Sequence, residues 1–154
     1  KNIKTKSSNK IKLIYVARRD DNYFKSWKGN DSLSGGMITN VGIHYLDLVT
    51  YLFGKVIDLD IKQNTFNRSS GTLTLEKGTL QWLFSFHPEE VEQFIEANES
   101  SHRSFLIDNE NIDFSNVSED LHTSCYKEII NDRGFSLDDA RPSIALIDKI
   151  MNKE

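Results

Sequence analysis

The feature of this sequence that most limits its fold is the segment SSGTLTLEKGTLQWLFSFH, residues 69–87. Apolar and polar residues alternate in TLTLE and again in TLQWLFSF, which is the pattern of two half-buried strands. Lys77-Gly78 between them predicts a tight turn. The segment therefore predicts a β-hairpin and an antiparallel sheet.

Further strands and three helices surround this hairpin. Runs of β-branched and aromatic residues predict strands at 11–19, 55–65, 101–108 and 111–115. Residues 88–100 fit either a loop or a short helix. Strands in one group and helices in others are typical of an α+β fold, so we expect an open, mainly antiparallel mixed sheet with helices on one face.

Each expected helix has an apolar stripe at three- and four-residue spacing. The helix in 34–54 ends at Gly54, and the helix in 118–134 ends at Gly134. Ser136 and Asp139 form a capping-box pattern for the last helix, inside which Pro142 predicts a kink or a later start. The stripes expected to be buried are Ile38, Val41, Tyr45, Leu48, Val49 and Leu52; Leu121, Cys125 and Ile129; and Ala140, Ile144, Ile147 and Met151.

Composition places the chain among globular proteins and excludes several functions. With 154 residues, of which 38% are hydrophobic, the chain can form one core, so we expect one domain over 11–154 after a polar tail, 1–10. A net charge of −4 gives no sign of a nucleic-acid partner, and no apolar run approaches the roughly 20 residues of a membrane span. The single cysteine excludes an internal disulfide, which fits the cytoplasm. No metal site is expected.

Four polar residues follow one line on the helix in 34–54: Asn40, His44, Asp47 and Tyr51. A lone histidine at such a place is more often a satisfied, half-buried side chain than a catalytic group. Gly42 between them argues for chemistry, since glycine inside a helix costs about 1 kcal/mol and suggests a close approach by a backbone or ligand. The loop Ser34-Gly35-Gly36 before the helix could turn backbone N–H groups toward a ligand.

Three segments together resemble a known enzyme family. They are SWKGNDSLSGGMITNVGIHYLDLVTYLFG, RSSGTLTLEKGTLQWLFS and DLHTSCYKEIINDRGFSLDDARPSIALI. The chain resembles the C-terminal domain of the Gfo/Idh/MocA oxidoreductases over residues 11–151, and within them the branch that acts on UDP-linked N-acetylamino uronic acids. Many members have Asp where this chain has Asn40, and Asn at this position matches that branch.

The resemblance implies an enzyme of two domains. The other domain would be an N-terminal Rossmann domain, outside this chain, that binds NAD or NADP and carries a catalytic lysine, and residues 1–10 would be the end of the connection. Here His44 would be the catalytic acid/base and Asn40 a substrate hydrogen-bonder. Tyr23, Trp27, Lys28, Ser34 and Gly35 would hold a nucleotide-sugar substrate, with Lys28 facing a carboxylate or phosphate.

Several alternatives stay open at this stage. The chain could belong to a branch that oxidises a free sugar or polyol, or be a binding or assembly module without chemistry. The open face of the sheet, with no helix assigned to it, is expected to pair subunits into a dimer or tetramer. His122 and Tyr126 share a line on the helix in 118–134, where partner contact and packing are equally consistent with the sequence.

Overall fold

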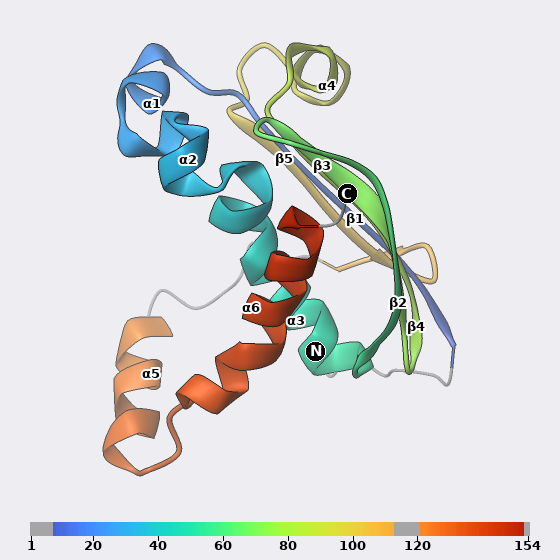
Figure 1. The fold of residues 1–154 in the computed structure, drawn as a ribbon, viewed down its shortest axis with the longest axis vertical. Coiled ribbons are helices and arrows are strands. Elements are labelled where there is room, and N and C mark those ends of the chain that lie inside the picture. The colour runs from blue at the N-terminus through green and yellow to red at the C-terminus, as the bar shows by residue number, and fades with distance from the viewer. Residues whose placement is uncertain (1–7, 113–120, 153–154) are drawn as a thin grey trace.

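The computed structural model describes residues 8–112 and 121–152, and its centre is a single six-stranded sheet (Figure 1). The strands run in the order β2-β3-β4-β1-β5-β6. Their bounds are β1 Asn9–Ala17, β2 Val56–Thr65, β3 Arg68–Leu75, β4 Gly78–Ser85, β5 Ser101–Ile107 and β6 Glu110–Asn111. Only the β1–β4 pair is parallel; the other four pairs are antiparallel. The expected open, mainly antiparallel mixed sheet is confirmed.

The hairpin alternation predicts which residues of β3 and β4 face the core. Leu73, Leu75, Leu80 and Trp82 are all buried, at 3% exposure or less. The turn lies one residue earlier than predicted, at Glu76 and Lys77, so that Gly78 is the first residue of β4. Of the last predicted strand, 111–115, residues 113–115 lie outside the described part of the chain.

The helices differ in length and in the face they cover. The two longest described helices that pack on the sheet, α3 and α6, lie on the same face and contact each other (Figure 1). The helical bounds are α1 Asp21–Lys25, η1 Trp27–Gly29, α2 Asp31–Ser34, η2 Ile38–Gly42, α3 Ile43–Phe53, α4 Pro88–Phe94, α5 Leu121–Ile130 and α6 Leu137–Met151. The segment 88–100 thus contains a short helix. Among the described residues, no helix combines the length and the apolar character needed to cross a bilayer.

The buried stripe of the first long helix is one residue out of phase with the prediction. After Ile38, the fully buried positions are Gly42, Leu46, Val49 and Phe53, whereas Val41, Tyr45 and Leu52 are only partly buried. The cause is η2, a π-helical turn, which adds one residue to a helical turn and rotates everything after it.

The stripe expected on α5 is wrong, and of the four residues expected to be buried on α6 only Ile147 is buried. In α5 no residue is buried, and Cys125 is exposed rather than a small core residue. In α6 the buried residues are Ser143, Leu146, Ile147 and Ile150, while Ile144 and Met151 are 56% and 42% exposed and Ala140 is exposed. The sequence of α6 has two apolar stripes, and only one of them can face α3 and the sheet. Pro142 lies inside the helix, which begins at Leu137 as the cap at Ser136 predicts.

The opposite face of the sheet is covered at one end by α4, so the expectation of helices on one face holds only for the larger elements. A small second core joins Ile14 and Val16 of β1 to Ile95, Val91 and Phe94.

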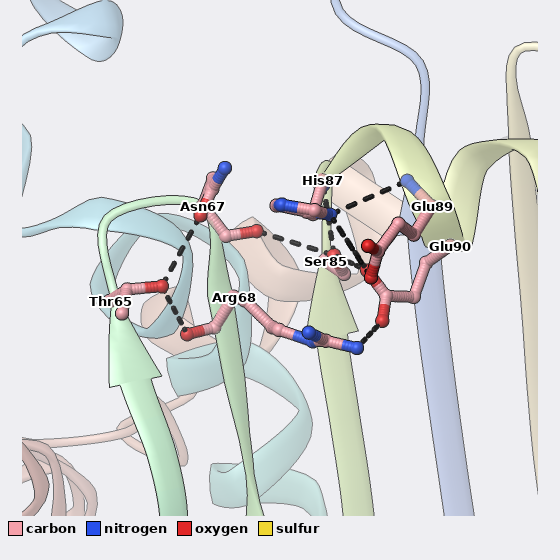
Figure 2. Close-up of polar contacts among 7 residues, drawn as sticks. All are labelled: Thr65, Asn67, Arg68, Ser85, His87, Glu89 and Glu90. Carbon is pink, nitrogen blue, oxygen red and sulfur yellow. Dashed lines mark hydrogen bonds and ion pairs between the residues drawn. The ribbon is translucent and has the colours of Figure 1, made fainter.

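A buried carboxylate fixes the start of α4 to the sheet (Figure 2). Glu90 is 3% exposed and forms an ion pair with Arg68 of β3. Its Oε2 accepts a hydrogen bond of 3.1 Å from the hydroxyl of Ser85, at the end of β4. The backbone N–H of His87 donates to the same hydroxyl at 2.9 Å, and His87 is the N-cap of α4. These contacts hold α4, and with it the loop that follows, at the ends of β3 and β4.

Candidate functional site

The loop between β1 and η2 is built from short helical turns, each with its own cap. Asp20 caps α1 by accepting the backbone N–H of Tyr23 at 2.9 Å. Ser26 caps η1, because its hydroxyl accepts the backbone N–H of Lys28 at 3.3 Å. The expected ordered loop is therefore present, and it gives Tyr23, Trp27 and Lys28 fixed positions.

The loop ends in two consecutive left-handed residues, Gly35 at φ 67° and Gly36 at φ 68°. Glycine is the residue that adopts this conformation without strain, which explains the pair. Asn40 joins this turn to η2: its Nδ2 donates to the carbonyl oxygen of Gly36 at 3.1 Å and to that of Ser34 at 3.3 Å. The Ser34 hydroxyl is buried and accepts the N–H of Gly36 at 3.2 Å. Asn40, Ser34 and Gly35 are thus brought together.

Gly42, two residues later, has a packing role. A Cβ at this position would lie 2.6 Å from Ile38 Cδ1 and 3.1 Å from two ring carbons of Phe84. The close approach at Gly42 is therefore made by two side chains, Ile38 of the same turn and Phe84 of the sheet, and not by a backbone.

His44 is exposed and lies on the wall of a groove between α3, β2 and α6. We call this the His44 groove; its volume is about 1600 Å³, and Asp47, Tyr51, Ser143 and Ile144 also line it. Asp47 accepts a hydrogen bond from the hydroxyl of Ser143, which ties α3 to α6. The predicted line of His44, Asp47 and Tyr51 is therefore a solvent-facing line, and the half-buried interpretation of His44 does not hold.

Tyr23, Trp27 and Lys28 line a second cavity, of about 900 Å³. We call it the Arg19 cavity; Arg18, Arg19 and the loop 97–100 complete its wall. The guanidinium of Arg19 lies 4.6 Å from the centre of the Tyr23 ring. Burial raises the pKa of the Tyr23 hydroxyl, and the neighbouring Arg19 lowers it in part.

The structure does not gather all the predicted site residues in one place. His44 lines the groove and Tyr23, Trp27 and Lys28 line the Arg19 cavity, whereas Asn40, Ser34 and Gly35 line neither. Arg18 and Arg19, at the end of a predicted strand, also line the Arg19 cavity, and a basic pair just before a polar, aromatic loop is the signal that could have indicated them. Ser143 has no such signal, because its partner Asp47 is far away in sequence.

No group of three or more His, Cys, Asp or Glu residues that could hold a metal ion occurs among residues 8–112 and 121–152. The scattered aspartates of the loop have local roles instead. Asp20, for example, caps α1.

The described residues thus form an α+β domain with a six-stranded mixed sheet, in which a helix follows a Gly-Gly turn and displays His44. A family profile described as "Oxidoreductase family, C-terminal alpha/beta domain" (GFO_IDH_MocA_C) matches residues 8–91. The chain therefore belongs to the C-terminal domain of the Gfo/Idh/MocA oxidoreductase family.

Within this family, the chain is similar to solved nucleotide-sugar dehydrogenases. The WlbA (WbpB) dehydrogenase of Thermus thermophilus, in complex with NAD and UDP-GlcNAcA, is 33% identical over 97% of this chain, with a TM-score of 0.85. The WlbA dehydrogenase of Bordetella pertussis, in complex with NADH and UDP-GlcNAcA, matches 92% of the chain at 17% identity and a TM-score of 0.62, which shows the shared fold. The chain spans about half the length of these structures, 48% and 51%.

Proposed function

We propose that this domain is the substrate-binding half of an NAD(P)-dependent dehydrogenase that oxidises a ring hydroxyl of a UDP-linked N-acetylamino uronic acid. The observation that carries the proposal is the similarity to the Thermus enzyme, which was solved with NAD and UDP-GlcNAcA and matches 97% of this chain at 33% identity. The Asn40–His44 pair on the helix after the Gly-Gly turn supports the same branch of the family.

The residues of this chain do not by themselves form a dinucleotide site. The sequence contains no G-x-G-x-x-G, the loop that holds a dinucleotide pyrophosphate at the start of a helix. We therefore assign cofactor binding to a second half of the enzyme, corresponding to the part of the solved relatives outside the match. NAD(P) bound there would supply the hydride acceptor.

In this proposal, His44 takes up the proton of the hydroxyl that is oxidised. Its side chain is exposed on the wall of a groove, where a substrate can reach it. Imidazole exchanges protons near neutral pH, which suits removal of a hydroxyl proton. Asn40 cannot take that role, because an amide does not accept a proton at neutral pH.

The other proposed residues hold the substrate. Lys28 and Trp27 of η1 are exposed, and Tyr23 lines the same cavity. Ser34 and Gly35 form the turn that Asn40 holds in place. We further propose that the domain assembles into a dimer or tetramer through the sheet face opposite α3 and α6.

The test is a substrate comparison with the complete enzyme, in which this domain is joined to its nucleotide-binding half. NADH formation is followed with UDP-GlcNAcA, with UDP-N-acetylglucosamine and with free sugars and polyols. We expect the highest kcat/KM for UDP-GlcNAcA. A higher value for a free sugar or polyol would assign the protein to a different branch, and no turnover of any of these would favour a binding or assembly module.

A further inference from the structure

The helix α6 has two apolar stripes, and the described part of the chain covers only one of them. Leu146, Ile147 and Ile150 are buried against α3 and the sheet. The second stripe faces outward, where Ile144 is 56% exposed and Met151 is 42% exposed. A helix that is apolar on opposite sides is normally enclosed on both sides. The outward stripe therefore indicates a further layer of protein over α6.

This outward stripe contributes to one wall of the His44 groove. Ile144 and Phe135, which lies just before α6, line the groove from this side, and Tyr51 of α3 and Ile57 of β2 line it from the other elements. Phe135, Tyr51 and Ile57 are 85%, 76% and 66% exposed. We call these four residues the apolar groove surface. Several large, exposed apolar side chains around one groove are typical of a surface that binds another protein surface.

The carboxylates that α6 contributes to the same groove have partners within the chain. They are Asp138, which pairs with Arg141, Asp139, which accepts the N–H and hydroxyl of Ser136, and Asp148, which accepts the side-chain amide of Asn152. Because these charges are already engaged, the apolar groove surface is the part of the groove that lacks a partner among the described residues.

The groove also extends well beyond the residue proposed for proton transfer. Tyr51 follows His44 by seven residues on α3, which is two helical turns or about 10 Å. A sugar ring at His44 therefore does not reach the far end of the groove. A charged nucleotide sugar also has little apolar surface with which to cover Tyr51, Ile57 and Phe135.

The reaction indicates which protein surface covers the groove. In the proposed function, hydride leaves the carbon whose hydroxyl proton His44 takes up, so His44 and the nicotinamide must meet the substrate at neighbouring atoms. The half of the enzyme that holds NAD(P) must then approach the groove that His44 lines. In the Thermus relative about half of the protein lies outside the match, since this chain covers 48% of it. A second copy of the chain is the other candidate, but we assign subunit pairing to the sheet face opposite α3 and α6.

We propose that the nucleotide-binding half of the enzyme docks on the apolar groove surface, so that the outward stripe of α6 becomes buried when the two halves are joined. This inference rests on the proposed function, which requires that half, and adds the surface of this domain on which it docks. The same contact would hold His44 at a fixed place relative to the cofactor.

A cysteine in the groove tests the docking directly. Ile144→Cys places a thiol on the apolar groove surface, and its alkylation by iodoacetamide can be followed by mass spectrometry of the peptide, apart from Cys125. Thiol reactivity depends on exposure. We expect alkylation of this cysteine to be at least about tenfold slower in the complete enzyme than in the 154-residue chain, because the nucleotide-binding half covers it only in the former.

A charge in the groove supplies a second measurement. Ile144→Glu should leave the melting temperature of the 154-residue chain within about one degree of the unchanged chain, since the position is exposed there. In the complete enzyme the same change should lower the melting temperature by several degrees, because it places a carboxylate in an apolar contact. Lys127→Glu is the matched control: it adds the same side chain at an exposed position of α5 that lines neither cavity, and it should leave both melting temperatures unchanged.

Three results would overturn the proposal. One is equal alkylation of Ile144→Cys in the chain and in the complete enzyme, and another is an unchanged melting temperature of the complete enzyme with Ile144→Glu. The third is protection of the cysteine in the 154-residue chain that increases with protein concentration, because a second copy would then be the partner.

These measurements are separate from the test of the proposed function. If the complete enzyme oxidises UDP-GlcNAcA while Ile144→Cys reacts as fast as in the 154-residue chain, the docking surface is wrong and the function stands. If the cysteine is protected in the complete enzyme but no UDP-sugar is oxidised, the function is wrong and the docking surface stands.

Discussion

Asn40 has a structural role in addition to the substrate-binding role that we propose for it. Both hydrogen bonds donated by its amide nitrogen go to the backbone carbonyl oxygens of Ser34 and Gly36, so Nδ2 acts on the protein itself. Contact with a substrate would then use the carbonyl oxygen Oδ1. The sequence pattern indicates a polar residue in line with His44, but it cannot show that the turn before the helix folds back onto that residue.

Asn40→Asp tests this bracing role. The substitution keeps the shape but turns two donors into acceptors that face the carbonyl oxygens of Ser34 and Gly36. We expect the free energy of unfolding to fall by roughly 1–3 kcal/mol, as for other unpaired groups in partly buried sites. Chemical denaturation of the chain measures it, with Asn111→Asp, at an exposed asparagine of β6, as the control. Equal stability of Asn40→Asp and the unchanged chain would show that the two hydrogen bonds do not contribute to the free energy of unfolding.

At the level of elements, the prediction of which helical residues are buried failed where it assumed a regular helical period. The strand pattern is local, so alternation alone predicts the hairpin and the residues of it that face the core. The π-helical turn at 38–42 shifts the phase of α3, and the sequence shows no signal for it apart from Gly42. Both α5 and α6 have an apolar stripe. Whether such a stripe is buried depends on which other elements pack against it, and the sequence of the helix alone does not contain that information.

Glu90→Gln tests the anchor of α4. The change removes the charge that faces Arg68 and leaves its half-buried guanidinium without a charged partner. We expect a loss of roughly 3 kcal/mol in the free energy of unfolding, at the low end of the range for broken buried pairs because Arg68 keeps some contact with water. Glu89→Gln, exposed on the same helical turn, is the matched control. Equal free energies of unfolding for Glu90→Gln and Glu89→Gln in denaturant would contradict the role of Glu90 in holding α4.

The capping box of α6 should give a dependence on pH. The backbone N–H of Ser136 and then its hydroxyl hold the pKa of Asp139 below its usual value. A lowered pKa means that this carboxylate stabilises the fold above its unfolded-state pKa, about 3.9, and loses that effect as the pH falls through the folded value. Asp139→Ala should therefore be less stable than the unchanged chain at neutral pH, and the gap should narrow in acid. Urea unfolding at a series of pH values measures the gap, and a constant difference from neutral to strongly acidic pH would rule out this role.

For the whole molecule, the sequence predicts the class of fold, whereas the assembly through the open sheet face stays a prediction. The open face of the sheet is polar at Lys12, Thr79 and Gln81, and α4 covers its far end at Ser85, which is fully buried. A polar face is compatible with water as well as with a second subunit, so its pattern alone does not specify the partner.

Sedimentation tests the proposed assembly through this face. We expect a dimer or tetramer at tens of micromolar protein. Gln81→Arg, in the middle of the face, should shift the equilibrium toward the monomer, because two copies would bring like charges together. A clean monomer for the unchanged chain would count against a large constitutive interface.

The central claim is that His44 is the catalytic acid/base of the complete enzyme. Its most direct test is the kcat of His44→Asn for UDP-GlcNAcA oxidation, together with a melting curve on the same preparation. His44 is exposed, so the melting temperature should stay within about one degree of wild type, as for other surface substitutions. The kcat should fall on the order of 10²–10⁴-fold, the usual contribution of a positioned proton-transfer group. His122→Asn, at an exposed position of α5, should leave both values unchanged. If His44→Asn melts several degrees lower and yet turns over at the wild-type rate, His44 is a structural residue and the catalytic assignment is wrong.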